Sequence, residues 1–168
     1  IELGSNNLNG WNFANQNLAG ANLGAILMDA DLSGANLDGA LFKWANLSGA
    51  NLSGANLNGA DLEGATLTST TNLSGANLAH AKFNRSELTS ADLSGVDLTG
   101  ASFDGSTLTD ADLSGANLTD ASFERSAMTN ADLSGTIIAG ANFSYTTGFT
   151  QSQLSSTASY QAGDLHGI

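Results

Sequence analysis

Few residues of this chain could carry out chemistry. Its 168 residues include sixteen Asp or Glu, four Lys or Arg, two His and no Cys. Without Cys there is no thiolate nucleophile, no disulfide framework and no thiolate metal site. His80 and His166 are too few for a histidine metal cluster, and no nucleophile elbow, phosphate-binding loop or dinucleotide fingerprint occurs. The sequence therefore predicts that the protein is not an enzyme and holds no cofactor.

The acidic residues are the remaining candidates for ion binding. Three of them follow one another at intervals of twenty residues, with a fourth close by: Asp92, Asp112, Asp132 and Asp110. The six-residue segments that begin at Asp29 and Asp110 imitate the start of a calcium-binding EF-hand loop. Their twelfth positions are Ala40 and Ala121, where an EF-hand carries a bidentate Glu. No metal site is predicted, and cation binding by the stacked aspartates, which would relieve their like-charge repulsion, is left open.

The net charge restricts the class of partner. Four basic and sixteen acidic residues give a formal net charge of −12 and a pI of about 4.1. Long-range repulsion therefore disfavours direct binding of nucleic acid or of anionic lipid. No apolar run approaches the roughly 18 residues that span a bilayer, so no membrane insertion is predicted and a protein is the expected partner. Because the chain opens on Ile1 instead of Met, we expect a processed product or an excised segment.

A five-residue repeat must position all of these side chains. The pattern Ala-Asn/Asp-Leu-Ser/Thr-Gly recurs from residue 21 to residue 143, and the large apolar residue is taken as the centre of each repeat. Centres occur from residue 3 to residue 143 and make 29 repeats. The register slips twice, with a four-residue step from Leu23 to Leu27 and a six-residue step from Leu67 to Leu73.

A period of five matches neither a helix nor a strand, so the chain must turn at every repeat. The residues Phe83, Phe103, Phe123 and Phe143 are spaced by twenty, which is four repeats. Four sides of five residues predict a square coil, and coils stacked about 4.8 Å apart by backbone hydrogen bonds predict an all-β solenoid of about seven coils. The centre and the Ala two residues before it point inward, while Asn, Asp, Ser, Thr and Gly take the corners.

These repeats resemble the pentapeptide-repeat proteins, whose motif is A-(D/N)-L-x-x. The match covers residues 3–143 and is specific because the motif recurs many times. The resemblance implies a right-handed quadrilateral β-helix. The first four repeats depart from the motif where Ala is expected, at Ile1, Asn6, Trp11 and Gln16. We expect residues 1–144 to form the β-helix.

Residues 145–168 are expected to form a C-terminal cap. Thr150 and Gln153 have the spacing of a capping box and predict one short helix over the last coil. A repeat-like segment then resumes at Asp164 and runs to Ile168. No helix is predicted at the N-terminal end, which is expected to be an uncapped edge. The end of one copy is in phase with the start of the next, so copies could stack end to end.

Sorting the repeats by side places every basic residue on one face of the coil. That face is predicted to carry Lys43, Trp44, Lys82, Arg85, Arg125 and Tyr145. One interpretation is that opposite charges are interleaved for solubility, since surface ion pairs contribute little individually. The other is a recognition surface, because Trp and Arg are enriched at binding hot spots.

Three functions remain open at this stage. The leading hypothesis is a non-enzymatic structural or protein-interaction module, a unit of a secreted or surface array or of an end-to-end fibre. Resemblance to topoisomerase-binding members of the family suggests instead an acidic mimic of DNA that binds gyrase. The third is a general protein-binding scaffold that uses the face with the basic residues. The absence of Cys leaves the compartment undetermined, and only the first hypothesis favours the cell exterior or surface.

Overall fold

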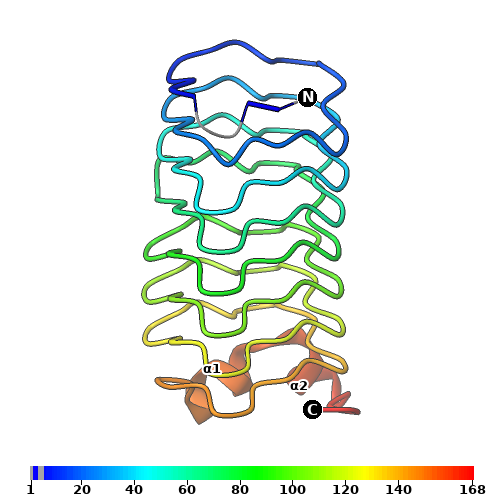
Figure 1. The fold of residues 1–168 in the computed structure, drawn as a ribbon. Coiled ribbons are helices and arrows are strands. Elements are labelled where there is room, and N and C mark those ends of the chain that lie inside the picture. Colours follow the sequence, from blue (N-terminus) through cyan, green and yellow to red (C-terminus); the bar gives the residue numbers. More distant parts are fainter. Residues whose placement is uncertain (1, 4–5) are drawn as a thin grey trace.

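The chain winds into a four-sided solenoid (Figure 1). The computed structural model describes residues 2–3 and 6–168. Each bridging residue pairs in parallel with a residue 19, 20 or 21 positions further along the chain, as in Asp112 with Asp132. Four five-residue repeats therefore make one coil, as the Phe spacing predicts. One column of bridges contains Glu2, Asn22, Leu41, Asp61, Lys82, Ser102, Ser122 and Asn142.

A regular set of backbone hydrogen bonds joins successive coils. The Leu113 N–H donates to the carbonyl of Asp132 at 2.9 Å, and the Asp132 N–H donates back to the carbonyl of Ala111 at 2.9 Å. Within the coil, the Ala116 N–H donates to the Leu113 carbonyl at 3.0 Å and closes the corner. Because the chain turns after every such set, the described residues form isolated bridges instead of longer strands.

The core is a column of large side chains flanked by alanines. From Leu23 to Ile138, every central residue is 3% exposed or less. Four of the Phe rings stack in parallel at centroid distances of 4.9, 4.8 and 5.2 Å, and Phe149 adds a fifth ring to Phe143 at 4.5 Å. Where a hydroxyl replaces the inward Ala, it donates to a carbonyl, as Ser126 does to Phe123 at 2.8 Å. The interior thus contains no space for a catalytic cleft.

The residues that break the motif lie at the N-terminal end of the core. Asn6, Trp11 and Gln16 take the repeat position that Ala holds elsewhere, but all three are exposed, Trp11 by 54%. The Trp11 ring stacks on Phe13 with centroids 5.8 Å apart, and of the centres of this first coil Leu8, Phe13 and Leu18 are buried while Leu3 is partly buried. The described residues of the predicted edge form no helix, and Trp11 packs against the core there through Phe13. Ile1, the other departure, lies outside the described residues.

The C-terminal end is covered by two helices, α1 (Gln151–Ser156) and α2 (Ala158–Ala162). The capping box of α1 is formed as predicted, with Thr150 and Gln153 each accepting from the other's backbone N–H. The prediction of one helix was wrong, because Thr157 ends α1 and also accepts from the Tyr160 N–H to begin α2. Five residues are too few for an apolar period to reveal such a helix.

The cap satisfies the backbone of the last coil. The Gly135 N–H donates to Ser156 at 2.9 Å, and the Ala158 N–H donates to the Thr136 carbonyl at 2.9 Å. Further on, the Gly140 N–H donates to the His166 carbonyl at 3.1 Å. One coil earlier, Asp120 makes the equivalent bond to Ala139, so the residues after α2 resume the register of the repeat. Neither helix, nor any other helix among the described residues, is long and apolar enough to cross a membrane.

Substitution of Phe103 tests the contribution of the stacked rings. Phe103→Ala should lower the free energy of unfolding by about 3–5 kcal/mol, because a ring held between two others leaves a cavity. Phe103→Leu is the control, and it should cost less than about 1.5 kcal/mol because Leu is the usual centre of the repeat. Denaturant unfolding followed by circular dichroism measures both, and equal losses would contradict the packing described here.

Candidate interaction surface

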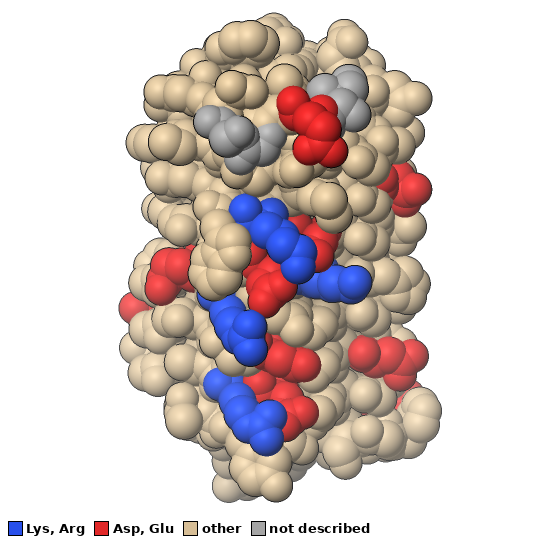
Figure 2. Space-filling view, in the orientation of Figure 1, with Lys and Arg blue, Asp and Glu red and all other residues tan. Residues whose placement is uncertain are grey.

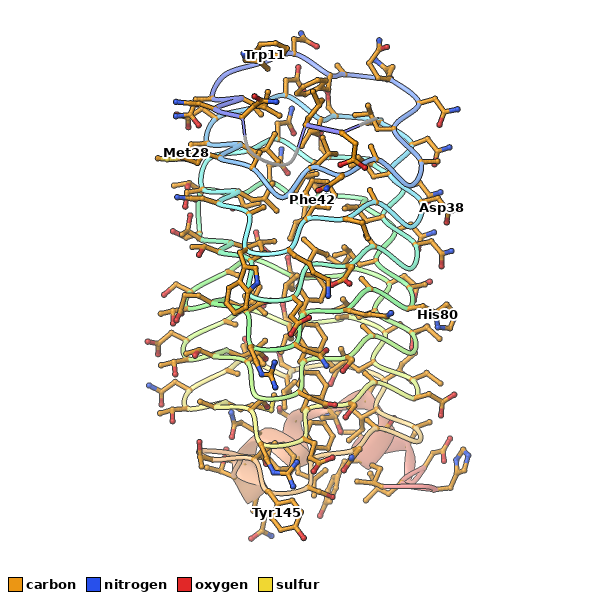
Figure 3. All side chains as sticks on the ribbon, viewed as in Figure 1. Trp11, Met28, Asp38, Phe42, His80 and Tyr145 are labelled. Carbon is orange, nitrogen blue, oxygen red and sulfur yellow. The ribbon has the colours of Figure 1, made fainter. Side chains whose placement is uncertain are left out.

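All four Lys and Arg residues gather on one side of the solenoid, in a stripe interleaved with carboxylates (Figure 2). This side, which carries the column of bridges from Glu2 to Asn142, is called the basic face. It brings together the six residues predicted from the sequence: Lys43, Trp44, Lys82, Arg85, Arg125 and Tyr145. Trp44 is 68% exposed and Tyr145 is 77% exposed. Figure 3 shows Tyr145 at the C-terminal end of this side, while Phe42 lies within the coil.

Four large side chains of the basic face share a left-handed backbone conformation. The φ angles are +58° at Trp44, +59° at Arg85, +58° at Arg125 and +59° at Tyr145. This corner position of the repeat is usually Gly, for which a positive φ has no steric cost. Elsewhere its non-Gly occupants are mostly Asn and Asp, which tolerate the conformation better than Trp, Arg or Tyr. The sequence therefore retains bulky residues where the backbone favours Gly.

Glycines follow two of these bulky residues along the corner. Gly64 and Gly105 hold the same position in the coils that follow Trp44 and Arg85. A Cβ atom added to Gly64 would collide with the Trp44 indole, so this ring lies flat against the next coil. The Arg85 side chain lies beside Gly105, but a Cβ there would be 3.9 Å from its Cγ, an ordinary van der Waals distance. Gly64 therefore makes room for the indole before it, while Gly105 is not required by the space that Arg85 takes.

A hollow of about 300 Å³ lies beside Trp44, on the side away from Gly64. The four-residue step after Leu23 omits one corner residue of the preceding coil, and Gly24 and Ala25 line the gap that results. Its full lining is Asn6, Asn7, Gly24, Ala25, Ile26, Trp44 and Asn46. The exposed indole therefore borders a recess with both apolar walls and amide groups.

An ion-pair network joins three coils of the basic face. The Lys43 ammonium lies 3.2 Å from Asp61 and 2.9 Å from Glu63, and Glu63 also accepts from Arg85 at 3.0 Å. The hydrogen bond to Glu63, followed by that to Asp61, raises the pKa of Lys43. The same bond from Lys43 lowers the pKa of Glu63. All of these groups are solvated, so the network contributes little to stability.

Arg125 and Lys82 differ in their surroundings. Arg125 pairs with Glu124 and lies 5.4 Å from the centroid of the Tyr145 ring, within the range of a cation–π contact. The Lys82 ammonium makes no ion pair with the described residues. Between the two arginines lies a shallow groove of about 400 Å³ lined by Glu63, Asn84, Arg85, Asp104, Gly105, Glu124 and Arg125. Within this groove the Asn84 Oδ1 is buried and accepts no hydrogen bond from the described residues.

The aspartate column lies on another side of the coil, called the aspartate face. Asp92, Asp112 and Asp132 are joined by successive bridges. Each Oδ1 accepts from a backbone N–H two residues on, as Asp112 does from Ser114 at 2.8 Å, so these carboxylates serve the turns of their own coils. Asp110 accepts from Asn130 at 3.0 Å. The described residues contain no group of three His, Cys, Asp or Glu side chains placed to hold a metal ion.

A family model described as pentapeptide repeats matches this chain in eight copies. The matched residues are 25–64, 45–70, 71–110 and 106–144, which together exceed half of the chain. The chain belongs to the pentapeptide-repeat family. The right-handed quadrilateral β-helix of such proteins accounts for the four-sided solenoid described above, and no enzymatic family is indicated.

Two solved pentapeptide-repeat structures illustrate the likeness. HetL, a protein involved in heterocyst differentiation regulation from the cyanobacterium Nostoc sp. strain PCC 7120, is 32% identical over 82% of this chain and 70% of its own, with a TM-score of 0.51. A trypsin-treated variant of QnrB1, a plasmid-mediated fluoroquinolone resistance protein, is 15% identical over 94% of this chain and 93% of its own, with a TM-score of 0.52. The latter identity supports the fold alone. No curated protein shows significant similarity.

Removing Lys43 from this pentapeptide-repeat protein should raise the pKa of Glu63. In Lys43→Gln the carboxylate loses its closest cation, so its titration should move up toward the usual range for Glu. Because folding lowers this pKa, the ion pair stabilises the wild type above the unfolded-state pKa, and the contribution is lost as pH falls through the folded value. NMR titration of the side-chain carboxyl measures the change. Lys82→Gln is the control, and an equal shift there would contradict the pairing.

Proposed function

We propose that this protein is a protein-interaction module whose recognition surface is the corner of the basic face. The observation that carries the proposal is the set of four bulky side chains in the left-handed conformation: Trp44, Arg85, Arg125 and Tyr145. Residues held in sparsely populated backbone conformations cost about 1–3 kcal/mol each and cluster at functional sites. Gly at these positions would remove that cost without altering the coil. The fold therefore does not require these four side chains, and a role in binding explains why they are present.

Solubility does not account for this composition. Interleaved charges explain Lys43, Glu63 and Arg85, which neutralise one another across neighbouring coils. They do not explain Trp44 and Tyr145, two exposed aromatic residues that lower solubility. Trp, Tyr and Arg are the residue types that contribute most to binding energy at protein interfaces. Their concentration along one corner fits recognition better than solvation.

The groove and the recess offer places for groups of a partner. The Asn84 Oδ1 is buried without a donor among the described residues, and a donor from a partner would satisfy it. The recess beside Trp44 has room for a single side chain. Aromatic side chains at interfaces often border such pockets, where water is excluded when the partner binds. Both features lie on the same face, so one partner could use them together.

End-to-end assembly stays a prediction, as does mimicry of DNA toward gyrase. A second copy stacked below the first would need the backbone groups of Gly135, Thr136 and Gly140, which the cap already binds. The charge of −12 permits mimicry of DNA, but the exposed Trp, Tyr and Arg residues of the basic face have no counterpart in a phosphate backbone. Recognition of a protein through the basic face makes use of all of these residues.

Glycine substitution tests the proposal with a control that the chain itself supplies. The triple variant Trp44→Gly, Arg85→Gly and Arg125→Gly installs the usual residue of the corner and removes three candidate contacts. The control triple, Ser90→Gly, Asp120→Gly and His80→Gly, makes the same change at left-handed corners outside the basic face. Both variants should fold at least as stably as the wild type, because a positive φ favours Gly.

Affinity capture from an extract of the source organism, quantified by mass spectrometry, provides the measurement. The first triple variant should lose at least about 90% of a specifically captured protein, since each hot-spot residue contributes about 2 kcal/mol or more. The control triple should retain that protein at the wild-type level. Equal capture by the wild type and both variants, or equal loss from both variants, would contradict recognition by the basic face.

A further inference from the structure

The hydrogen-bond ladder between coils is interrupted at one place on the aspartate face. The central residues of this face are Phe13, Leu32, Leu52, Leu73, Leu93, Leu113 and Leu133. Every other pair of neighbouring coils on this face makes three backbone hydrogen bonds. They are the two described for Leu113 and Asp132 and a third like that from the Gly115 N–H to the Ser134 carbonyl. Between Leu73 and Leu93 none of the three is formed, and Asn72 and Asp92 make no bridge. Thus the two coils are not directly hydrogen-bonded there.

Donors and acceptors are left facing each other in equal numbers. By the pattern of the other coils, the Leu73 N–H would donate to Asp92, the Gly75 N–H to Ser94 and the Asp92 N–H to Thr71. None of these N–H groups donates to any described backbone or side-chain acceptor. The adjoining bonds expected from Ser69 to Thr89 and from Asp97 to Ala76 are missing as well, at the two corners of this face. In total, five backbone N–H groups and five carbonyl groups lack the hydrogen bonds between coils that the pattern predicts.

The six-residue step between Leu67 and Leu73 accounts for the interruption. One extra residue enters the chain there, at Thr70 or Thr71. Thr71 keeps the inward position of Ala and anchors it by donating its hydroxyl to the Leu47 carbonyl at 2.9 Å. The coil before it stays joined, with Leu52 donating to Asn72 at 2.8 Å. The extra length is therefore taken up on the C-terminal side of this coil, where the ladder opens.

A polar hollow of about 310 Å³ marks the gap. Its lining is Ser69, Thr70, Thr71, Asn72, Leu73, Ser74, Asp92, Ser94 and Val96. Buried backbone N–H and C=O groups are almost always hydrogen-bonded, to water if not to protein. The occupant must therefore satisfy the released groups of both coils.

Water satisfies the groups of the gap better than a cation, an anion or an inserted strand. A cation would bind the carbonyls and leave the N–H groups unsatisfied, and an anion would do the reverse. An inserted strand would need a second coil spacing of about 4.8 Å. The neighbouring sides prevent such a separation, because Thr66 remains bridged to Glu87, and Asn77 to Asp97. Water donates and accepts, and several molecules fit in a hollow of this volume.

We infer that a row of water molecules bridges the coils of Leu73 and Leu93, and that the solenoid opens first at this hydrated seam. The seam is the contact between residues 69–76 and residues 89–97 on the aspartate face. It divides the solenoid into two blocks, and within each block the ladder of the aspartate face is unbroken. Local opening occurs where backbone hydrogen bonds are solvent-accessible and few in number, so the boundary between the blocks exchanges with solvent before either block unfolds.

Amide hydrogen exchange on the wild-type protein tests the seam, with matched amides one coil later. Leu73, Gly75 and Asp92 should have protection factors roughly 100-fold lower than Leu93, Gly95 and Asp112, whose hydrogen bonds are formed. The local sequences are nearly identical, which removes intrinsic differences in rate. Equal protection of the two sets of amides would overturn the proposal. It would also be overturned if sodium or calcium chloride raised the protection of the first set, because a bound cation would then occupy the gap.

Deletion of Thr70 provides a second, independent test. It restores the five-residue step and leaves Thr71 in its inward position, so the seam should close and the protection of Leu73 should rise to the level of Leu93. Deletion of Thr99 is the control, because it removes a residue from a regular repeat and should lower protection around it. If the Thr70 deletion unfolds the protein, or leaves Leu73 as exposed as before, the extra residue is not the cause of the gap and the inference fails.

Discussion

Each side of this solenoid is held to the next coil by one short set of backbone hydrogen bonds, and the rest of the structure depends on that set, which is missing on the aspartate face only between Leu73 and Leu93. The bonds require a residue of each coil to meet its counterpart 19 to 21 positions later. A five-residue repeat with a large apolar centre and a small inward residue two positions earlier satisfies this spacing four times per turn. The stacked core and the columns of surface residues follow from the same spacing.

This constraint explains why function must lie on the surface. The interior of the described coils is filled by one large side chain per repeat and mostly by Ala beside it, so the residues that can vary freely are those that point outward. The corners can vary, and the left-handed corner varies most informatively. The positive φ at that corner favours Gly, so a Trp, Arg or Tyr there is unfavourable for the backbone and indicates another role. The charge of the chain is similarly partitioned, with all of its Lys and Arg on the basic face.

Much of the fold could be predicted from the sequence, because the repeat is long and each of its positions has one physical role. The spacing of Phe83 and Phe103 predicted the four-sided coil, and the pair Thr150 and Gln153 predicted the start of α1. The grouping of the basic residues followed from counting repeats. Helix α2 could not be predicted, since its only signal is the single cap at Thr157. The buried acceptor of Asn84 depends on packing between coils, which repeat counting does not describe.

The sequence reveals the positions of the two register slips but does not predict their structural effects. Both were visible as changes in step length, but their effects differ because the neighbouring side chains differ. The shorter step leaves a recess that the Trp44 indole borders, whereas the longer step opens the backbone ladder beside Leu73. The positive φ of Trp44 was also accessible from the sequence, since most repeats have Gly at that corner. The departures from the repeat therefore give this protein the features that its regular part lacks.

The hydrogen-bond register itself can be measured directly by NMR, through scalar couplings between an amide nitrogen and the carbonyl carbon across each bond. The structure predicts couplings from Leu93 to Asp112 and from Leu113 to Asp132, and none from Leu73 to Asp92. Couplings that join the Leu93 or Leu113 N–H to any other residue, or the absence of both couplings, would contradict the four-sided coil on which the whole account depends.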